Sequence, residues 1–241
     1  MAPELSPPVV LALLRRERLA QAARLLRGVV HNLSGGLQML RLPLDLLELK
    51  LAQGQTQDLG AKLGAMHHGF DRTNAEVELL ATRASQLQQD AAAPHDLARL
   101  AQDQLAFWRA DMYFKHEVQL ETDLPRASPK CQGSYLDLAL AFNALVANAL
   151  EAMAPAGARR LRVEWRQEQG RALLSVSDDG PGPSPEVAPR MFEAFSGDKD
   201  GSHDGLGLFL AKAALAPWGG DILWQAGSPK VFCLALPLLK T

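Results

Sequence analysis

The fold is decided by residues 135–153, YLDLALAFNALVANALEAM. This strongly apolar run predicts a helix that is buried in a core. Asn143 and Asn148 interrupt it, and its apolar stretches fall short of the roughly 20 residues that a membrane span requires. We therefore expect the central helix of a globular domain and no membrane span.

Segments of strand and helix character surround this helix. Residues 161–166 and 172–177 predict a β-hairpin that turns at Glu168-Gln169-Gly170. Further helices are expected at 96–110 and 206–216, and further strands at 118–122, 221–225 and 231–236. Elements in this order predict a mixed, largely antiparallel sheet covered by helices on one face, which is an α/β sandwich.

The first part of the chain carries a heptad pattern instead. Its apolar residues alternate in steps of four and three, at Leu26, Val30, Leu33, Leu37, Leu40, Leu44, Leu47 and Leu51. After a polar break the alternation restarts at Leu59 and continues to Leu87. Two such helices predict an antiparallel hairpin, which residues 9–27 prolong at its start. A single hairpin would expose an apolar stripe, so we expect a homodimer that closes a four-helix bundle.

These patterns predict an α+β protein with two domains, a helical hairpin at 1–93 and the sandwich at 94–241. Gly35, Gly36 and Pro43 stand inside the first helix. A glycine there costs about 1 kcal/mol and a proline roughly 3 kcal/mol relative to alanine. Two explanations remain open, a tolerated kink and a helix that is softened for function.

Composition narrows the classes of function. Lys and Arg number 25 against 27 Asp and Glu, and the net charge of -2 provides no basic field for nucleic acid. The two cysteines are far apart and match no metal-ligand spacing. The start, MAPELSPP, lacks the basic and apolar regions of a secretory signal, so we expect a cytoplasmic protein.

Four segments in the second half carry the chemistry: NALVANALEAM (143–153), SDDGPGP (177–183), MFEAFSGDK (191–199) and DGLGLFLAK (204–212). In order and spacing they resemble the ATP-binding domain that sensor histidine kinases share with DNA gyrase. The resemblance covers residues 94–241 and implies that the domain binds ATP with Mg²⁺.

The resemblance assigns roles to residues of these segments. It implies that Asn148 offers Mg²⁺ a carbonyl oxygen, a hard ligand that suits this ion. Asp178 would accept a hydrogen bond from the adenine amino group, and Gly180 and Gly182 would let the backbone turn beneath the base.

The last two segments are expected at the phosphates. Gly205 and Gly207 precede a helix, so its free N–H groups and its dipole would point toward them. Lys199 falls where many relatives place a lysine that reaches the γ-phosphate, and Phe192 and Phe195 match the paired aromatic residues of the family.

One departure separates this chain from the ATPases of the superfamily. They carry a general-base glutamate four residues before the metal-binding asparagine, where this chain has Ala144. Asn143 lies one residue away, so that role is not transferred to it. A Mg-dependent ATPase is therefore disfavoured.

The candidate phosphoryl acceptor is His31, in HNLSGGLQ (31–38) on the first helix. Histidine kinases place this residue beside the seam, and His31 follows the seam residue Val30, so it should point outward. Asn32 is a second candidate catalytic residue, because it stands where relatives have an acidic residue that helps the histidine, although an asparagine offers only a carbonyl dipole. Gly35 stands where relatives have a threonine or asparagine. His67 and His68 on the second helix are the next candidates.

The resemblance thus predicts a soluble histidine kinase. It would transfer the γ-phosphoryl group of Mg-ATP to His31 and then to an aspartate of a response-regulator receiver domain. Too few residues precede His31 for a sensor domain, so an upstream sensor or regulatory protein is expected. The alternative is a non-catalytic dimeric phosphotransfer or adaptor protein with a degenerate ATP-binding domain. Nucleotide binding would separate the two.

Overall fold

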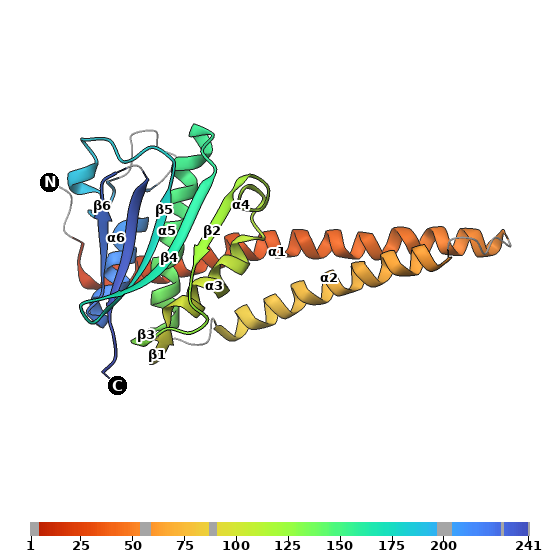
Figure 1. Cartoon of the computed structure of the whole chain (residues 1–241), viewed down its shortest axis with the longest axis horizontal. Coiled ribbons are helices and arrows are strands. Elements are labelled where there is room, and N and C mark those ends of the chain that lie inside the picture. The colour runs from red at the N-terminus through yellow and green to blue at the C-terminus, as the bar shows by residue number, and fades with distance from the viewer. Residues whose placement is uncertain (1–4, 54–58, 87–90, 197–203, 228, 241) are drawn as a thin grey trace. The chain divides into compact units, whose positions relative to one another are not determined.

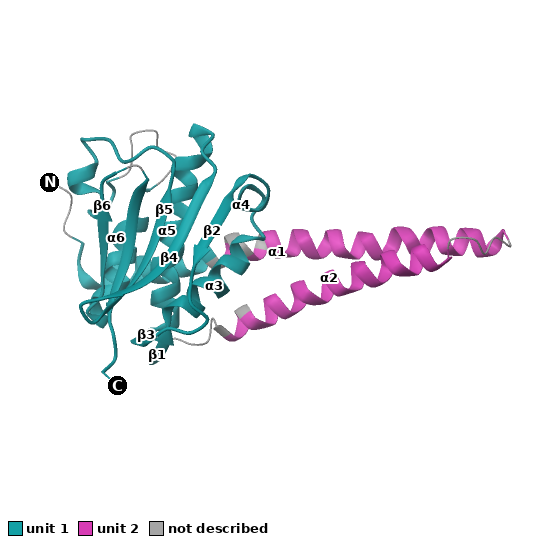
Figure 2. Ribbon diagram, viewed as in Figure 1, with its two compact units in different colours: residues 1–22, 89–241 teal, residues 23–88 magenta. Residues whose placement is uncertain are grey.

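The structure is a computed structural model (Figure 1), and it describes residues 5–53, 59–86, 91–196, 204–227 and 229–240. It divides into two compact units, which Figure 2 colours separately. One unit contains residues 23–88, and the other contains residues 1–22 and 89–241. The first 22 residues, which the sequence assigns to the hairpin domain, belong with the carboxy-terminal unit.

Residues 23–88 form a helical hairpin. It consists of the second part of α1 (Pro7–Ala52) and of α2 (Leu59–Gln86). Pro43 lies inside α1 without ending it. The two helices approach closely at Gly36, where an added Cβ would lie 2.5 Å from the Thr73 hydroxyl oxygen. Gly36 therefore serves helix packing, whereas a Cβ on Gly35 would meet nothing within 4 Å.

The hairpin leaves every second seam residue of α1 uncovered. The exposed fractions are 55% for Val30, 51% for Leu37, 42% for Leu44 and 51% for Leu51. On α2 the heptad-spaced residues Leu63, Phe70 and Val77 are exposed as well. These seven residues are called the heptad stripe below. The expectation that one hairpin exposes an apolar stripe is confirmed.

The carboxy-terminal unit is built on a five-stranded sheet in the order β2-β4-β5-β7-β6. Only β2 and β4 are parallel, as expected for a mixed and largely antiparallel sheet. The strands are β2 (Gln119–Asp123), β4 (Arg160–Glu168), β5 (Arg171–Asp178), β6 (Asp221–Gln225) and β7 (Lys230–Pro237). The β4–β5 hairpin turns at Gln169 and Gly170, whose φ angles are both positive, as a tight two-residue turn requires.

Helices cover one face of this sheet (Figure 1). They are α3 (Leu97–Trp108), α5 (Tyr135–Ala156) and α6 (Gly207–Leu215). The buried residues Ala172, Leu174 and Val176 alternate along β5 and point toward these helices. α5 is long and apolar enough to span a bilayer by composition, but most of it is buried inside this unit.

Several short elements were not expected. The sequence ends the hairpin domain at residue 93, but residues on both sides of that point lie in β1 (Ala92–Asp96). This strand forms a separate two-stranded sheet with β3 (Lys130–Ser134). The helix α4 (Met112–Glu117) starts at an Asp111 side chain that accepts from the Phe114 N–H group. Two single 3-10 turns, Ala188–Arg190 and Ala216–Trp218, complete the unit.

The start of α1 packs on the carboxy-terminal unit. Leu13 and Leu14 contact a cluster that contains Leu140, Leu210 and Ala214. Arg18 donates a hydrogen bond to the Asp137 carboxylate, which also accepts from the Trp218 indole N–H group at 3.1 Å. These contacts explain why residues 1–22 do not belong to the hairpin unit.

Candidate functional site

The site is arranged around α5. Asn148 lies on this helix and is half-buried. Asn143 is 1% exposed, and its amide oxygen accepts from the Trp108 indole N–H group at 2.9 Å. Its amide nitrogen donates to the Gln104 side chain at 2.9 Å. Asn143 is thus part of the core between α3 and α5, and its amide group is engaged there.

Asp178 ends β5 and is buried. Its Oδ1 accepts from the Gly180 backbone N–H group at 2.9 Å. The same oxygen lies 3.2 Å from Nζ of Lys230, whose side chain is 4% exposed. Burial raises the pKa of the Asp178 carboxyl above its ordinary value, and the Lys230 ammonium opposes part of that rise. The carboxylate is thus a buried acceptor held beside a cation.

Gly180 brings the end of β5 against α5. A Cβ on this glycine would lie 3.0 Å from the backbone of Ala152 and Met153 and 2.8 Å from Asp178 Oδ1. Ala152 follows Asn148 by about one helical turn. The structure therefore brings Asp178, Gly180 and the Asn148 region of α5 together. A Cβ on Gly182 would meet nothing within 4 Å, so the close approach is confined to the first glycine.

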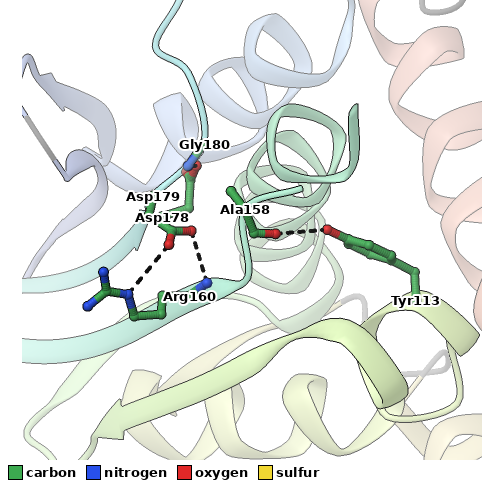
Figure 3. A network of polar contacts seen from close by, with 6 residues as sticks. All are labelled: Tyr113, Ala158, Arg160, Asp178, Asp179 and Gly180. Atoms are coloured by element: carbon green, nitrogen blue, oxygen red, sulfur yellow. Dashed lines mark hydrogen bonds and ion pairs between the residues drawn. The ribbon is translucent and has the colours of Figure 1, made fainter. Parts of the chain in front are cut away.

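The Asp179 side chain is directed away from Asp178 and Gly180, toward Arg160. Figure 3 shows both carboxylates at the end of β5, with the interactions from Arg160 drawn to Asp179. The Arg160 backbone N–H group donates to Asp179 at 2.9 Å, and the guanidinium group lies 3.4 Å from the other carboxylate oxygen. Tyr113 donates to the Ala158 carbonyl at 3.2 Å. The Arg160 contacts hold the end of β5 beside the start of β4, and the Tyr113 contact ties α4 to the residues before β4.

The glycines of the last segment lie where α6 begins. Gly207 is its first residue, and Gly205 has a φ of +60°, which favours glycine. Among the described residues, no side chain caps the first turn of α6. Its N–H groups can therefore donate to an anion, as the expected phosphate role requires.

The aromatic pair differs in its two members. Phe192 packs under the Lys212 ammonium, which lies 5.1 Å from the ring centroid. Phe195 is 53% exposed and has a φ of +62°, a strained value for a residue with a side chain. Lys199, the expected γ-phosphate contact, lies outside the described residues.

His31 and Asn32 lie in the hairpin unit. His31 is exposed, as expected for a phosphoryl acceptor. Asn32 is 7% exposed and shares a helix face with the buried Val29 and Gly36. The assistance expected from Asn32 stays a prediction, and the structure places this residue inside the hairpin. His67 and His68 are also exposed.

Lys230 is the residue of this site that sequence reasoning missed. It is the first residue of β7 and lies opposite Asp178 in the sheet register. Its Nζ also donates to the Pro181 carbonyl at 2.6 Å. The available signal was a lysine that opens the otherwise apolar strand KVFCLALP. A charge in such a position requires a buried partner.

Comparison with known proteins agrees with this geometry. Residues 133–240 match the family model described as histidine kinase-, DNA gyrase B-, and HSP90-like ATPase. The C4-dicarboxylate transport sensor protein DctB of Rhizobium meliloti is 26% identical over 217 residues, which are 89% of this chain and 34% of DctB. The sensor-like histidine kinase SenX3 of Mycobacterium tuberculosis is 34% identical over 130 residues, which are 51% of this chain and 31% of SenX3.

Solved structures share the fold of the second unit. The mycobacterial sensor histidine kinase MprB matches with a TM-score of 0.51 and 23% identity, over 63% of this chain and 100% of that one. The catalytic domain of histidine kinase ThkA matches with a TM-score of 0.54 and 18% identity, over 61% and 96%.

Residues 133–240 of the carboxy-terminal unit are therefore a domain of the histidine kinase-, DNA gyrase B-, and HSP90-like ATPase family. The chain is similar to sensor histidine kinases over this domain and, in the case of DctB, over most of its length. It spans 34% and 31% of the lengths of DctB and SenX3.

Proposed function

We propose that this chain is a histidine kinase that transfers the γ-phosphoryl group of Mg-ATP to His31 and passes it to an aspartate of a response-regulator receiver domain. The buried Asp178 carboxylate carries the proposal. It stands at the strand end of a family ATP-binding domain, next to Gly180 and α5. The exposed His31 on the helical hairpin supplies an acceptor of the right chemistry.

The nucleotide would be held at its two ends. Asp178 would accept from the adenine amino group, and the first turn of α6 would donate to phosphate oxygens. Leaving a buried carboxylate without its partner costs about 1 to 3 kcal/mol, so this contact selects for the base.

The residues present fit Mg²⁺ in one respect. Asn148 offers a half-buried amide oxygen, which is a hard ligand. The described residues contain no group of three or more His, Cys, Asp or Glu side chains that could hold a metal. Asn148 would therefore be the protein ligand, with phosphate oxygens and water completing the set. When bound, the ion neutralises charge on the phosphates.

His31 would act as the nucleophile. Its neutral imidazole Nε2 would attack the γ-phosphorus, forming an N–P bond while the bond to the β,γ-bridging oxygen breaks. ADP leaves with the electron pair. The phosphoryl group would then move from His31 to an aspartate carboxylate of the receiver domain, which restores the neutral imidazole.

The active species would be a homodimer. The heptad stripe exposes seven large apolar side chains on the two helices of one hairpin. A second copy, with the same spacing, matches this stripe and would bury it in a four-helix bundle.

One observation favours the alternative, a non-catalytic phosphotransfer or adaptor protein. The Asp178 side chain is 1% exposed and already paired with Lys230. If this pair closed the base site permanently, the domain would bind no nucleotide. Measuring ADP affinity by titration calorimetry decides between the two functions.

The deciding experiment for the kinase is incubation with γ-labelled ATP. We expect an acid-labile and base-stable label on the wild type, none on His31→Ala, and unchanged labelling on the matched controls His67→Ala and His68→Ala. Addition of a receiver domain should remove the label, whereas its Asp→Asn variant should not. Label that persists on His31→Ala would refute the assignment of the acceptor.

A further inference from the structure

Lys230 places a buried cation beside the base-recognition carboxylate. We propose that Lys230 is a second base-reading residue and that the site accepts 6-oxopurine nucleotides, such as guanine nucleotides, as well as adenine nucleotides. The inference rests on the proposed nucleotide-binding function and extends it to the range of bases.

Asp178 and Lys230 each keep a hydrogen-bonding group that can bind a ligand. An ammonium group has three donors. Lys230 directs one to the Pro181 carbonyl at 2.6 Å and one to Asp178 Oδ1 at 3.2 Å. The Gly180 N–H group also binds Oδ1. Within the described part of the chain, the carboxylate contacts therefore converge on Oδ1. One Lys230 donor and Asp178 Oδ2 remain for a ligand.

The two purine edges need opposite patterns. Adenine presents an amino donor at C6 and an acceptor at N1, whereas a 6-oxopurine presents an acceptor at O6 and a donor at N1. A carboxylate alone accepts from the adenine amino group and repels O6. The Asp178–Lys230 pair offers an acceptor and a donor side by side. It can match adenine, and it can match a 6-oxopurine with Lys230 donating to O6 and Asp178 accepting from N1–H.

Burial makes this matching decisive. The side chains of Asp178 and Lys230 are 1% and 4% exposed. In such surroundings an unmatched donor or acceptor is not compensated by water, so polar patterns discriminate strongly. A merely structural Lys230 would only hold the turn at Pro181. Its loss would then change the affinities for all nucleotides by the same factor.

The test compares diphosphates, because they bind without transferring a phosphoryl group. ADP, GDP and IDP are titrated into the full chain by calorimetry, IDP being included because it lacks the 2-amino group of guanine. For the wild type we expect GDP or IDP to bind within roughly tenfold of ADP. In Lys230→Met the affinity for the 6-oxopurines should fall at least roughly tenfold relative to ADP. Lys230→Arg should preserve the ratio, and the exposed Lys115→Met is the matched control.

The outcomes separate the two proposals. Binding of ADP together with rejection of both GDP and IDP by the wild type would overturn the role of Lys230, even if Lys230→Met fails to fold. An unchanged ratio in a folded Lys230→Met would overturn it too. Absence of binding by all three diphosphates would instead overturn the nucleotide-binding function, and this inference with it.

Discussion

The raised pKa of Asp178 predicts how the affinity for nucleotide depends on pH. Burial raises this pKa, and the ionised carboxylate accepts from the adenine amino group more strongly than the protonated carboxyl does. On acidification, ADP affinity should therefore begin to fall at a higher pH than an ordinary aspartate would cause. Calorimetric titrations from about pH 8 down to about pH 5 measure this. Asp178→Asn should bind ADP weakly at every pH in the series.

The same shift has a consequence for stability. A carboxyl whose pKa is raised by folding contributes stability below its unfolded pKa and loses that contribution as the pH rises through the folded value. Lowering the pH therefore stabilises the folded state through Asp178 and weakens nucleotide binding. An ADP affinity that stays constant over the whole acidic range would contradict the assignment of Asp178 to the base.

The sequence predicted one half of the Asp178–Lys230 pair. Asp178 was recognised because it stands in a motif, SDDGPGP, whose residues are contiguous. Lys230 has no such motif, and only the pairing of β5 with β7 brings it opposite Asp178. For Asn32 the sequence pattern was informative about the motif but not about burial. Its position after His31 suggested a chemical role, whereas helix packing places it inside the hairpin.

At the scale of elements, strong local sequence patterns were sufficient to predict most helices and strands of the carboxy-terminal unit. The strand β6 was predicted with its observed bounds, and the helices α3, α5 and α6 within a few residues. The strand β1 was missed because AAPHD contains a proline and residues of low strand propensity. It exists through its pairing with β3, whose partner residues lie far along the chain. Tertiary pairing of this kind leaves no periodic signal in a short segment.

The adjacent glycines of α1 give a prediction about the hairpin. Gly35→Ala should raise the free energy of unfolding by about 1 kcal/mol, because alanine favours a helix and its Cβ meets nothing within 4 Å. Gly36→Ala should lose that gain, because its Cβ would displace the Thr73 hydroxyl from the Gly69 carbonyl. Losing this bond costs about 1 kcal/mol.

Urea unfolding of both variants checks the pair. Thr73→Ala combined with Gly36→Ala should recover stability relative to Gly36→Ala alone, as a double-mutant cycle would show. Equal gains from Gly35→Ala and Gly36→Ala would mean that the two helices do not approach at this point.

On the scale of the whole molecule, the start of α1 is predicted to stabilise the carboxy-terminal unit. Arg18→Met removes one of the two side chains that donate to the Asp137 carboxylate, and this pair is largely buried. The loss should lower the unfolding free energy of this unit by about 1 to 3 kcal/mol. It should also change the environment of the Trp218 indole, which shares the Asp137 carboxylate. Tryptophan fluorescence during urea unfolding measures both, and the exposed Arg16→Met is the control.

Assembly can be tested on the heptad stripe. Leu37→Glu combined with Leu44→Glu places charges on the exposed stripe and should yield monomers by light scattering at micromolar concentration. The hairpin should stay helical, because these residues are not buried within one chain. Leu42→Glu is the matched control, since this exposed leucine lies on another face of α1. A wild-type monomer under these conditions would remove the homodimer from the proposal.

Under the proposed function, pairing through the heptad stripe would make the output depend steeply on gene dosage. If the working species is a pair of chains, its amount rises with the square of the chain concentration until pairing saturates. Halving expression below that point would leave about a quarter of the pairs rather than half. Under the proposed function, a cut in synthesis would then lower the kinase output more than proportionally, and a surplus of His31→Ala chains would sequester functional chains in mixed pairs.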